Sequence, residues 1–514
     1  MKNNPENRNR WPYVLVALAI LAVVFFFSSR ERLVDPDEGA YLLAAKLVME
    51  GKSVYTDFFW PQMPLLPYAY GIWMEIFGTD WYAARYFSGF LGVAMGLLLF
   101  FHVVRLTGKQ VWGFLAVLLF ATSSFSIGWF STAKTYPLST FLLFAAYLSL
   151  FADRLKDWKY LAAGVLLGLA VSTRLYFIGL VPVFFWLVYR QKSQAEGTGG
   201  LFLKHGAGLL LGLAPAFFFL FKNPDNFYFN NVGYHFLRSD YNFGSSIKQK
   251  FEAVLRLLGW GLTEGFIGAQ FALLLLVNAY FSYRHIRAHK KLPASIWLTV
   301  FLIPLLFIPT PTHLQYFSSL LPFLVLNTVW ATAQKSEEVR QKKLSTARFQ
   351  RALAVAVLGY VAMGIADFYQ YCYAGKKVPG VGGGPEYAQY WKISAIQSTS
   401  QLIDRNIAAE AEPVMSFWPG YLLESKAVIW PGMENHSSVV ITVKMTPAQR
   451  EKYRIVSLEE IFLGVLRQKT RLVILEVWDR GPGRASLTEA MKASGFAPIL
   501  QIGAKEIYKW NGKK

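Results

Sequence analysis

The sequence predicts a polytopic α-helical membrane protein with a C-terminal soluble α/β domain. The chain of 514 residues is 54% hydrophobic and only 16% charged, which is far from the balance of an ordinary soluble domain. Apolar runs approaching the roughly 20 residues that cross hydrocarbon recur between residues 11 and 370. Beyond residue 390 the pattern changes to short β-rich runs that alternate with helical ones. These three observations separate a membrane part from a tail.

The apolar runs predict about eleven transmembrane helices. The stretch from residue 159 to 190 is too long for one span, and we expect a turn at Ser172, Thr173 and Arg174 to divide it. The first span is followed by charged residues instead of a small-residue cleavage site, so we expect it to stay as an anchor. The spans are predicted at 11–29, 86–104, 111–130, 135–152, 160–172, 175–189, 205–221, 259–282, 293–310, 312–333 and 352–370.

The net charge of +20 is spread over alternate loops and does not form one patch. Basic residues gather before residue 11 and near residues 105, 154, 190, 284–291 and 335–351. This is the positive-inside pattern of a membrane protein, so we expect no nucleic-acid partner and a cytoplasmic N-terminus. The loops 30–85 and 222–258 and the C-terminal tail then face outward. The single cysteine, Cys372, excludes an intrachain disulfide.

We expect a membrane catalytic domain at 1–370, with the first outer loop at 30–85, a linker at 371–390 and an outer α/β domain at 391–514. The three glycines Gly382 to Gly384 are typical of a linker, because no strand precedes them and no helix follows directly. In the tail, strands are predicted at 414–417, 471–477 and 506–510, and helices at 398–408, 458–468 and 487–494.

An acidic cluster opens the first outer loop. Asp35, Pro36 and Glu38 match a helix start, with a capping side chain, a proline at the first position and an acid that reaches back to the cap. Capping leaves Asp37 unexplained. Its carboxylate at a helix N-terminus stays ionised and can accept a proton from a hydroxyl, so we interpret Asp37 as a catalytic or substrate-binding residue.

The helix predicted after this cap has one apolar stripe, formed by Tyr41, Ala44, Ala45 and Val48. A one-sided stripe predicts a helix that lies along the membrane surface instead of crossing it.

Asp35 and Asp37 also form an Asp-x-Asp pair, a pattern that can hold a metal beside a nucleotide diphosphate. A nucleotide is not expected, because activated nucleotides are cytosolic and no phosphate-cradling glycine loop accompanies the pair. A weak divalent cation site stays open. We therefore predict no cofactor and no dedicated metal ligands.

Cationic and aromatic residues share the predicted outer face. Each one alone is typical of an interfacial anchor, because long cationic side chains extend toward water at helix ends. Together they predict a pocket for an anionic headgroup. The candidates are Arg85, Lys134, Arg174 and Arg238, with His313 and Tyr316 after a proline-marked turn.

The order of residues in the first outer loop resembles that of the GT-C membrane glycosyltransferases, in the branch of the protein O-mannosyltransferases and the aminoarabinose transferase ArnT. The residues that carry the resemblance are Asp37, Glu38, Tyr41, Gly51, Tyr55, Asp57, Pro64, Leu65, Phe77, Gly78 and Arg85. The likeness extends more loosely over residues 11–370, including 313–322.

The resemblance implies a polyprenyl-phosphate sugar donor, an acceptor hydroxyl on a lipid, glycan or protein, and Asp37 as the catalytic base beside Glu38. It implies substrate binding by Tyr41, Tyr55, Asp57, Arg85, Lys134, Arg174, Arg238, His313 and Tyr316. The run from Trp60 to Pro64 lacks the lysine of ArnT-like chains, which argues against an aminoarabinose donor. The tail has no room for the extra domain of eukaryotic mannosyltransferases, so we expect an enzyme of the bacterial cytoplasmic membrane with a periplasmic C-terminus.

Two alternatives remain at the level of sequence. A transporter or flippase of lipid-linked sugars also has many spans, but transporters place binding groups near the bilayer midplane in two related halves. Here the charges gather at one boundary. A ligase that moves a whole glycan shares the fold and differs only in the size of its donor.

Overall fold

The computed structural model describes residues 11–191, 198–238, 242–260, 265–342, 345–375, 385–476, 482–502 and 505–512. The chain forms two compact units. The helical unit comprises Met1–Arg32, Arg85–Ala214 and Tyr241–Gly383, and the sheet-bearing unit comprises Leu33–Ala84, Pro215–Asp240 and Gly384–Lys514. The first predicted outer loop therefore belongs to the same unit as the C-terminal tail. The domain boundaries at 370 and 390 stay a prediction, and the linker glycines lie outside the described residues.

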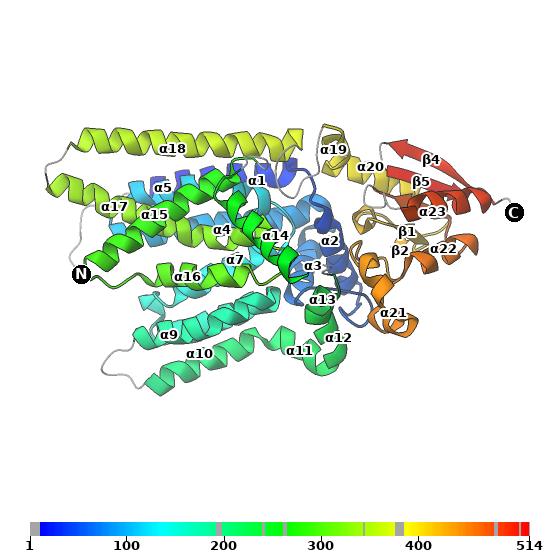
Figure 1. Cartoon of the computed structure of the whole chain (residues 1–514), viewed down its shortest axis with the longest axis horizontal. Coiled ribbons are helices and arrows are strands. Elements are labelled where there is room, and N and C mark those ends of the chain that lie inside the picture. Colours follow the sequence, from blue (N-terminus) through cyan, green and yellow to red (C-terminus); the bar gives the residue numbers. More distant parts are fainter. Residues whose placement is uncertain are drawn as a thin grey trace. The chain divides into compact units, whose positions relative to one another are not determined.

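The helical unit is built almost entirely of helices (Figure 1). Its elements are α1 (Trp11–Glu31), α4 (Trp81–Thr107, whose first turn lies in the other unit), α5 (Gln110–Ala121), α6 (Ser124–Trp129), α7 (Thr135–Ser149), η2 (Asp153–Leu155), α8 (Trp158–Thr173), η3 (Leu175–Leu180), α9 (Val181–Arg190), α10 (Thr198–Gly212), α14 (Phe243–Leu257), α15 (Ile267–Arg287), α16 (Ala294–Leu306), η5 (Leu314–Leu320), α17 (Leu321–Gln341), α18 (Thr346–Tyr369) and η6 (Gln370–Ala374).

Four helical stretches of the described chain are long and apolar enough to cross a membrane: Trp11–Glu31, Trp81–Thr107, Leu314–Gln341 and Thr346–Ala374. The helices Gly199–Gly212 and Ala214–Lys222 meet the same criterion only as a pair, and they are bent by 56° at the break between them, as in a broken span or a re-entrant loop. Only 17% of the apolar window in Thr346–Ala374 is buried inside the protein. An apolar helix that exposes so much of its surface is expected to face lipid, and the chain is an integral membrane protein. The count of eleven spans stays a prediction, since the other apolar helices have 10–17 residues.

The predicted turn between residues 172 and 174 is confirmed. Helix α8 ends at Thr173, Arg174 has an extended backbone with φ −145° and ψ 113°, and η3 begins at Leu175. The predicted span at 111–130 is instead interrupted, because α5 ends at Ala121 and the Ser123 hydroxyl caps the separate helix α6.

Helices α8 and α10 pack closely because small residues lie between them, four positions apart on each helix. A Cβ on Gly164 would lie 2.2 Å from the carbonyl oxygen of His205, and one on Gly212 would lie 2.1 Å from that of Val165. Gly168 and Gly208 make similarly close contacts. Such spacing brings helix backbones together in membranes, where packing replaces the hydrophobic effect.

The sheet-bearing unit combines short helices with a five-stranded sheet. Its helices are α2 (Pro36–Met49), α3 (Leu65–Phe77), α11 (Ala214–Lys222), α12 (Pro224–Tyr228), η4 (Phe229–Gly233), α13 (Tyr234–Arg238), α19 (Pro385–Tyr390), α20 (Ile393–Asp404), η7 (Pro419–Leu422), η8 (Val439–Lys444), α21 (Pro447–Tyr453), α22 (Leu458–Leu466) and α23 (Pro482–Ala493). Its strands are β1 (Pro413–Ser416), β2 (Val428–Ile429), β3 (Leu472–Leu475), β4 (Phe496–Ile502) and β5 (Lys505–Trp510).

The strand order is β2-β1-β3-β5-β4. Strand β1 pairs in parallel with β2 and β3, whereas β5 pairs antiparallel with β3 and β4. The runs predicted at 414–417 and 506–510 coincide with β1 and β5, and the run at 471–477 contains β3, with Val477 outside the described residues. Strand β4 and helix α21 were not predicted.

The prediction that the helix after the acidic cluster is apolar and buried on one side only is wrong, whereas its position along the membrane surface stays a prediction. Helix α2 forms, but ten of its fourteen residues are buried, on every side of the helix. One reason is contact with η7: a Cβ on Gly39 would lie 2.8 Å from the Cα of Gly420 and from the Trp418 ring. Tertiary packing therefore also covers the side of the helix outside the predicted stripe, where Leu42, Leu43 and Leu47 are buried.

Candidate active site

The start of α2 holds three carboxylates in two different situations. The backbone N–H of Asp37 donates to Asp35 Oδ1 at 3.0 Å, and that of Asp35 donates to Glu38 Oε1 at 2.8 Å. The Asp35 side chain also accepts from the backbone N–H of Glu38, which completes the predicted capping box and confirms it. Asp35 and Glu38 are buried, whereas the Asp37 side chain is 43% exposed. Asp37 is therefore the carboxylate of the three that solvent or a substrate reaches readily.

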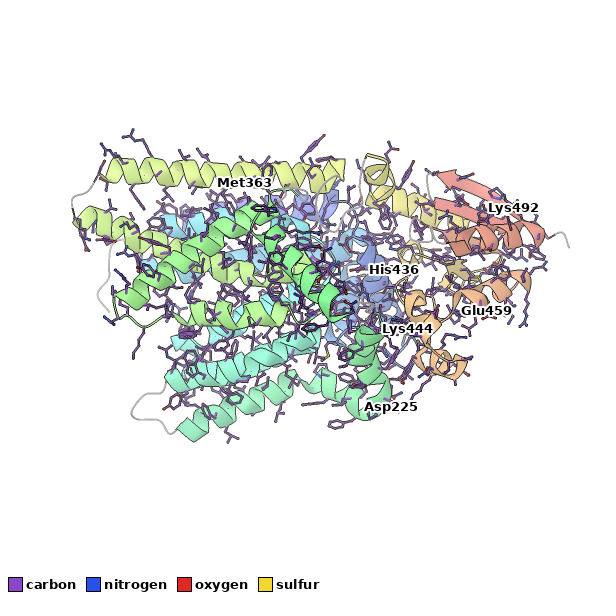
Figure 2. The ribbon with its side chains drawn as sticks, viewed as in Figure 1. Asp225, Met363, His436, Lys444, Glu459 and Lys492 are labelled. Atoms are coloured by element: carbon purple, nitrogen blue, oxygen red, sulfur yellow. The ribbon has the colours of Figure 1, made fainter. Side chains whose placement is uncertain are left out.

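A histidine from the C-terminal part of the chain lies beside Asp37. The Nε2 atom of His436 is 3.8 Å from Asp37 Oδ1, and the His436 side chain is 13% exposed. His436 is labelled in Figure 2. The distance suits an ion pair with a protonated imidazole but exceeds that of a direct hydrogen bond. A bridging water would connect the two groups when the imidazole is neutral.

Helix α13 positions the segment that carries His436. The Tyr234 hydroxyl donates to Ser437 Oγ at 3.2 Å, and Lys444 Nζ donates to the carbonyl oxygen of Leu237 at 2.7 Å. Tyr234 is itself buried in an apolar cluster with Phe59, Phe229, Ile441, Met445 and Ile455. The residue next to His436 is thus fixed to a packed helix.

The same tyrosine links two predicted site residues. Burial raises the pKa of Tyr234, the Asp37 carboxylate raises it further, and the charge of Arg238 opposes both. The structure therefore brings Asp37, Tyr234, Arg238 and His436 together, and we call these four residues the acid corner. Tyr234 and His436 were not predicted from the sequence, because they lie about 200 and 400 positions from Asp37 and no local motif marks them.

Glu434 is a further ionisable group in the segment before His436. Burial raises the pKa of Glu434 to about 7, against the opposing charges of Lys52 and Arg454. The backbone N–H of Gly432 donates to Glu434 Oε2 at 2.9 Å. This carboxyl therefore changes its charge close to neutral pH.

Three other predicted residues of the first loop have local contacts. Tyr41 is buried, with its ring centroid 5.4 Å from that of Trp60. The Tyr55 hydroxyl donates to the carbonyl oxygen of Gln62 at 2.6 Å, and Asp57 Oδ2 accepts from the backbone N–H of Ser53 at 2.7 Å. These contacts hold the loop in shape, and a role of the three residues in substrate binding stays a prediction.

In the helical unit, several predicted cationic and aromatic residues gather around Tyr136. The Arg174 guanidinium lies 4.3 Å from the Tyr136 ring centroid, 5.3 Å from that of Tyr176 and 5.4 Å from that of Tyr316. Lys134 Nζ is 5.8 Å from the Tyr136 centroid, and the His313 ring is 5.6 Å from Tyr316. We call Lys134, Tyr136, Arg174, Tyr176, His313 and Tyr316 the aromatic cation cluster.

Helix ends place the two cations of this cluster. Lys134 is the N-cap of α7 and makes no capping hydrogen bond through its side chain, and Arg174 follows the last residue of α8. Arg174 Nε donates to Thr135 Oγ1 at 2.6 Å, and its Nη1 donates to the Tyr176 hydroxyl at 2.9 Å. Both cations are buried. Positive side chains at a helix N-terminus form a favourable environment for an anion.

Arg85 has a different setting. It is fully buried, and its Nη1 donates to the carbonyl oxygens of Arg32 at 2.5 Å and Ser29 at 3.3 Å. These are carbonyls at the C-terminal end of α1 that have no partner within the helix. The Arg85 side chain therefore caps the C-terminal end of α1. These contacts do not support its predicted role in substrate binding.

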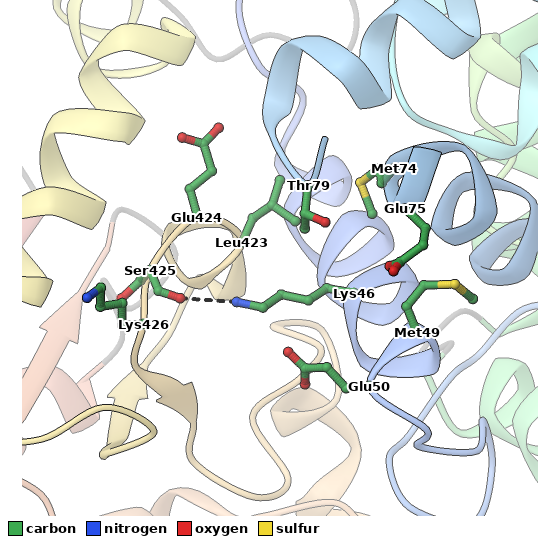
Figure 3. A pocket seen from close by; sticks show the side chains of 10 residues that line it. All are labelled: Lys46, Met49, Glu50, Met74, Glu75, Thr79, Leu423, Glu424, Ser425 and Lys426. Atoms are coloured by element: carbon green, nitrogen blue, oxygen red, sulfur yellow. Dashed lines mark hydrogen bonds between the residues drawn. The ribbon is translucent and has the colours of Figure 1, made fainter. Parts of the chain in front are cut away.

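A cavity of about 310 Å³ lies at the other end of α2, lined by residues of α2, α3 and the segment 423–426 (Figure 3). Lys46 reaches across it and donates to the carbonyl oxygens of Leu422 and Ser425 at 3.0 and 3.1 Å. A helix rises about 1.5 Å per residue, so the nine positions between Asp37 and Lys46 correspond to roughly 13 Å. The cavity is separate from the acid corner. Among the described residues no group of three or more His, Cys, Asp or Glu side chains could hold a metal ion, and a dependence on a divalent cation stays untested.

Comparison with known proteins identifies the architecture. Residues 61–221 match the family model described as dolichyl-phosphate-mannose-protein mannosyltransferase. The crystal structure of ArnT from Cupriavidus metallidurans in the apo state has a TM-score of 0.63 and 13% identity, and the match covers 97% of each chain. ArnT from the same organism bound to undecaprenyl phosphate matches with the same score and identity over 97% of this chain and 98% of that chain.

The chain has the GT-C fold that ArnT has. The predicted resemblance to GT-C enzymes is thereby confirmed, and it extends over the tail as well as residues 11–370. No curated protein matches the chain significantly by sequence. At 13% identity the structural match shows a shared fold, and the chemistry rests on the residues described above.

Proposed function

We propose that this protein is a membrane glycosyltransferase that moves a sugar from a polyprenyl-phosphate donor to an acceptor hydroxyl. The observation that carries the proposal is that the Asp37 carboxylate is accessible to solvent in a chain with the GT-C fold. Its two acidic neighbours are buried in a capping box, whereas Asp37 keeps an accessible carboxylate beside His436. A carboxylate that a substrate hydroxyl can reach, beside a histidine, suits a general base.

In the proposed reaction, Asp37 removes the proton from the acceptor hydroxyl while the acceptor oxygen attacks the anomeric carbon. The bond from that carbon to the phosphate oxygen breaks, and its electron pair leaves with the phosphate. Attack opposite the leaving group inverts the anomeric configuration. His436 then relays the proton from Asp37 to solvent through a water, which restores the base for the next turnover.

The leaving phosphate requires positive charge more than a proton, because a phosphate is already a weak base. The aromatic cation cluster supplies buried cations at the start of α7, and the planar guanidinium of Arg174 can donate two parallel hydrogen bonds to phosphate oxygens. Stabilisation of developing charge by fixed groups is usually the largest part of catalysis. The ArnT structure with bound undecaprenyl phosphate supports a lipid phosphate as the donor's leaving group.

The proposed cellular setting follows from the charge pattern. Basic loops at 284–291 and 335–351 favour the cytoplasm, so the acid corner and the C-terminus are proposed to face the periplasm of a bacterial cell. The acceptor there is a lipid, a glycan or a protein. Asp37→Cys would test this assignment, because a membrane-impermeant thiol reagent should label it from outside in intact spheroplasts, in a chain whose Cys372 is replaced by serine.

Reconstitution separates transfer from transport. Purified full-length protein in liposomes is supplied with undecaprenyl-phosphate sugars and with lipid and oligosaccharide acceptors, and products are followed by mass spectrometry. We expect a covalent glycosylated product of inverted configuration and release of undecaprenyl phosphate. Movement of the donor between leaflets without a covalent product would instead show a flippase, and transfer of intact oligosaccharide in preference to a single sugar would show a ligase.

A further inference from the structure

A cavity of about 570 Å³ lies within the helical unit, away from every residue of the aromatic cation cluster. It is enclosed by the C-terminal half of α15, the C-terminal half of α17 and the first turns of α18. Part of its lining is apolar, formed by Val277, Phe281, Phe349 and Leu353. Another part is charged, with the cations Arg284, Lys290 and Lys335 against the carboxylates Glu337 and Glu338. The proposed transfer reaction does not use this cavity.

Positively charged side chains around the cavity outnumber the carboxylates. Glu338 Oε2 is 2.7 Å from Arg284 Nη1 and 3.2 Å from Lys335 Nζ, and Glu338 Oε1 is 2.8 Å from Lys342 Nζ. Three cations thus share one carboxylate. The segments 284–291 and 335–351 together contain ten Lys and Arg residues against two Glu. An anionic ligand would be attracted by this excess.

The apolar lining continues into an exposed apolar surface of the same helices. Leu276, Tyr280 and Tyr283 of α15 are exposed large side chains, and Tyr280 also lines the cavity. On α18, Val355 and Leu358 are exposed just beyond the lining residues Ala352 and Leu353. The cavity therefore combines a cationic pocket with an adjoining apolar helix surface. This combination is complementary to a lipid, which has a charged headgroup and apolar chains.

We propose that this cavity binds the headgroup of an anionic phospholipid from the leaflet on the side of the basic loops. The lipid phosphate would lie against Arg284, Lys290 and Lys335, and the first methylene groups of its chains along Phe281 and Phe349. Basic pockets between membrane helices on the cytoplasmic side are suited to such headgroups. Free phosphate would satisfy the cations but leave the apolar lining without a partner.

A pair of charge-matched double variants tests the proposal. Lys290→Gln with Lys335→Gln removes two cations of the lining. Arg287→Gln with Lys342→Gln removes two cations from the same segments that do not line the cavity, and Lys342, like Lys335, pairs with Glu338. Full-length protein in neutral detergent is titrated with phosphatidylglycerol or phosphatidylcholine, and bound lipid is counted by native mass spectrometry.

We expect wild-type protein to prefer phosphatidylglycerol, and the Lys290/Lys335 variant to bind it on the order of 25-fold more weakly, at about fivefold for each charge removed. The Arg287/Lys342 variant should stay within about twofold of wild type. Equal weakening of both variants would show diffuse attraction and overturn the site. Equal binding of phosphatidylcholine, or displacement of the lipid by millimolar inorganic phosphate, would overturn the assignment to an anionic lipid. None of these outcomes depends on glycosyl transfer.

Discussion

The aromatic cation cluster and the acid corner differ in how far their charged side chains are exposed to solvent. In the cluster, Arg174 and Lys134 are buried, and rings and hydroxyls around them fix their positions. In the acid corner, Asp37 stays 43% exposed, and its partner His436 lies at ion-pair distance without a direct hydrogen bond. Burying a cation costs free energy unless hydrogen bonds or aromatic rings around it replace the lost water. A cation buried in this way attracts an anion strongly, because the protein interior screens charge less than water does. A side chain that accepts a proton and passes it on instead needs access to solvent and freedom to move. In the proposed reaction, the role of the cluster is to bind phosphate and the role of the corner is to accept the proton.

Replacement of Asp37 should have the largest effect. Asp37→Asn removes the proposed base with little change in shape, and we expect kcat to fall by about 10² to 10⁴ with little change in the KM for the donor. Glu75→Gln is the matched control, since Glu75 is an exposed carboxylate of α3 in the same unit. Rates are measured by transfer of a radiolabelled sugar in liposomes. A normally folded Asp37→Asn protein with most of its activity would remove the acid corner from the mechanism.

Glu434 should make stability depend on pH. Its pKa in the folded protein is about 7, raised from 4.5 by burial. Below pH 4.5 both states hold the proton, and between 4.5 and 7 only the folded state does, so stability falls as pH rises through this window and then levels off. The loss is about 3 kcal/mol.

Glu434→Gln should flatten this part of the profile, as measured by Tm between pH 4.5 and 8. Glu410→Gln, at an exposed carboxyl group paired with Lys426, should leave it unchanged. A Glu434→Gln protein with the wild-type slope would mean that another group titrates.

Replacement of Arg174 tests whether the aromatic cation cluster binds the donor phosphate. We expect Arg174→Gln to raise the KM for the lipid-phosphate donor by about 10- to 100-fold and to affect kcat less, because a charge-assisted hydrogen bond is worth about 1.5–3 kcal/mol. Arg174→Lys should recover only part of the loss, since lysine keeps the charge but not the planar fork. Arg190→Gln is the control, because Arg190 also lies over an aromatic ring, that of Trp186. A fall in kcat alone would contradict a binding role.

His436 should give the smallest effect and the most specific one. We expect His436→Asn to lower kcat by about 3- to 10-fold and to remove one titrating limb from the pH–rate profile. In a protein that already carries Asp37→Asn, the same change should have no further effect, because the two residues act as a unit. His289→Asn serves as the control. Additive effects of the two substitutions would show that His436 acts independently of Asp37.

The two regions also differ in how much of them could be predicted from the sequence. Lys134, Arg174, His313 and Tyr316 were all predicted, because each stands at the end of an apolar run where a charged or polar residue is conspicuous. The capping box at Asp35 and Glu38 was predicted as well, since it is encoded within four residues. Tyr234 and His436 were not predicted. They reach Asp37 only through packing of α13 against the segment that ends in η8.

By itself the sequence determined that the chain is a membrane protein, that α2 begins at Pro36 with a capping box that does not include the Asp37 side chain, and that α8 ends before Arg174. Each of these follows from residues a few positions apart, where helix capping and hydrophobic length operate. Only the tertiary structure decided that α2 is buried on all sides, that Arg85 closes α1, and that His436 lies beside Asp37. These depend on contacts between distant segments, which burial of apolar surface selects and no local pattern records.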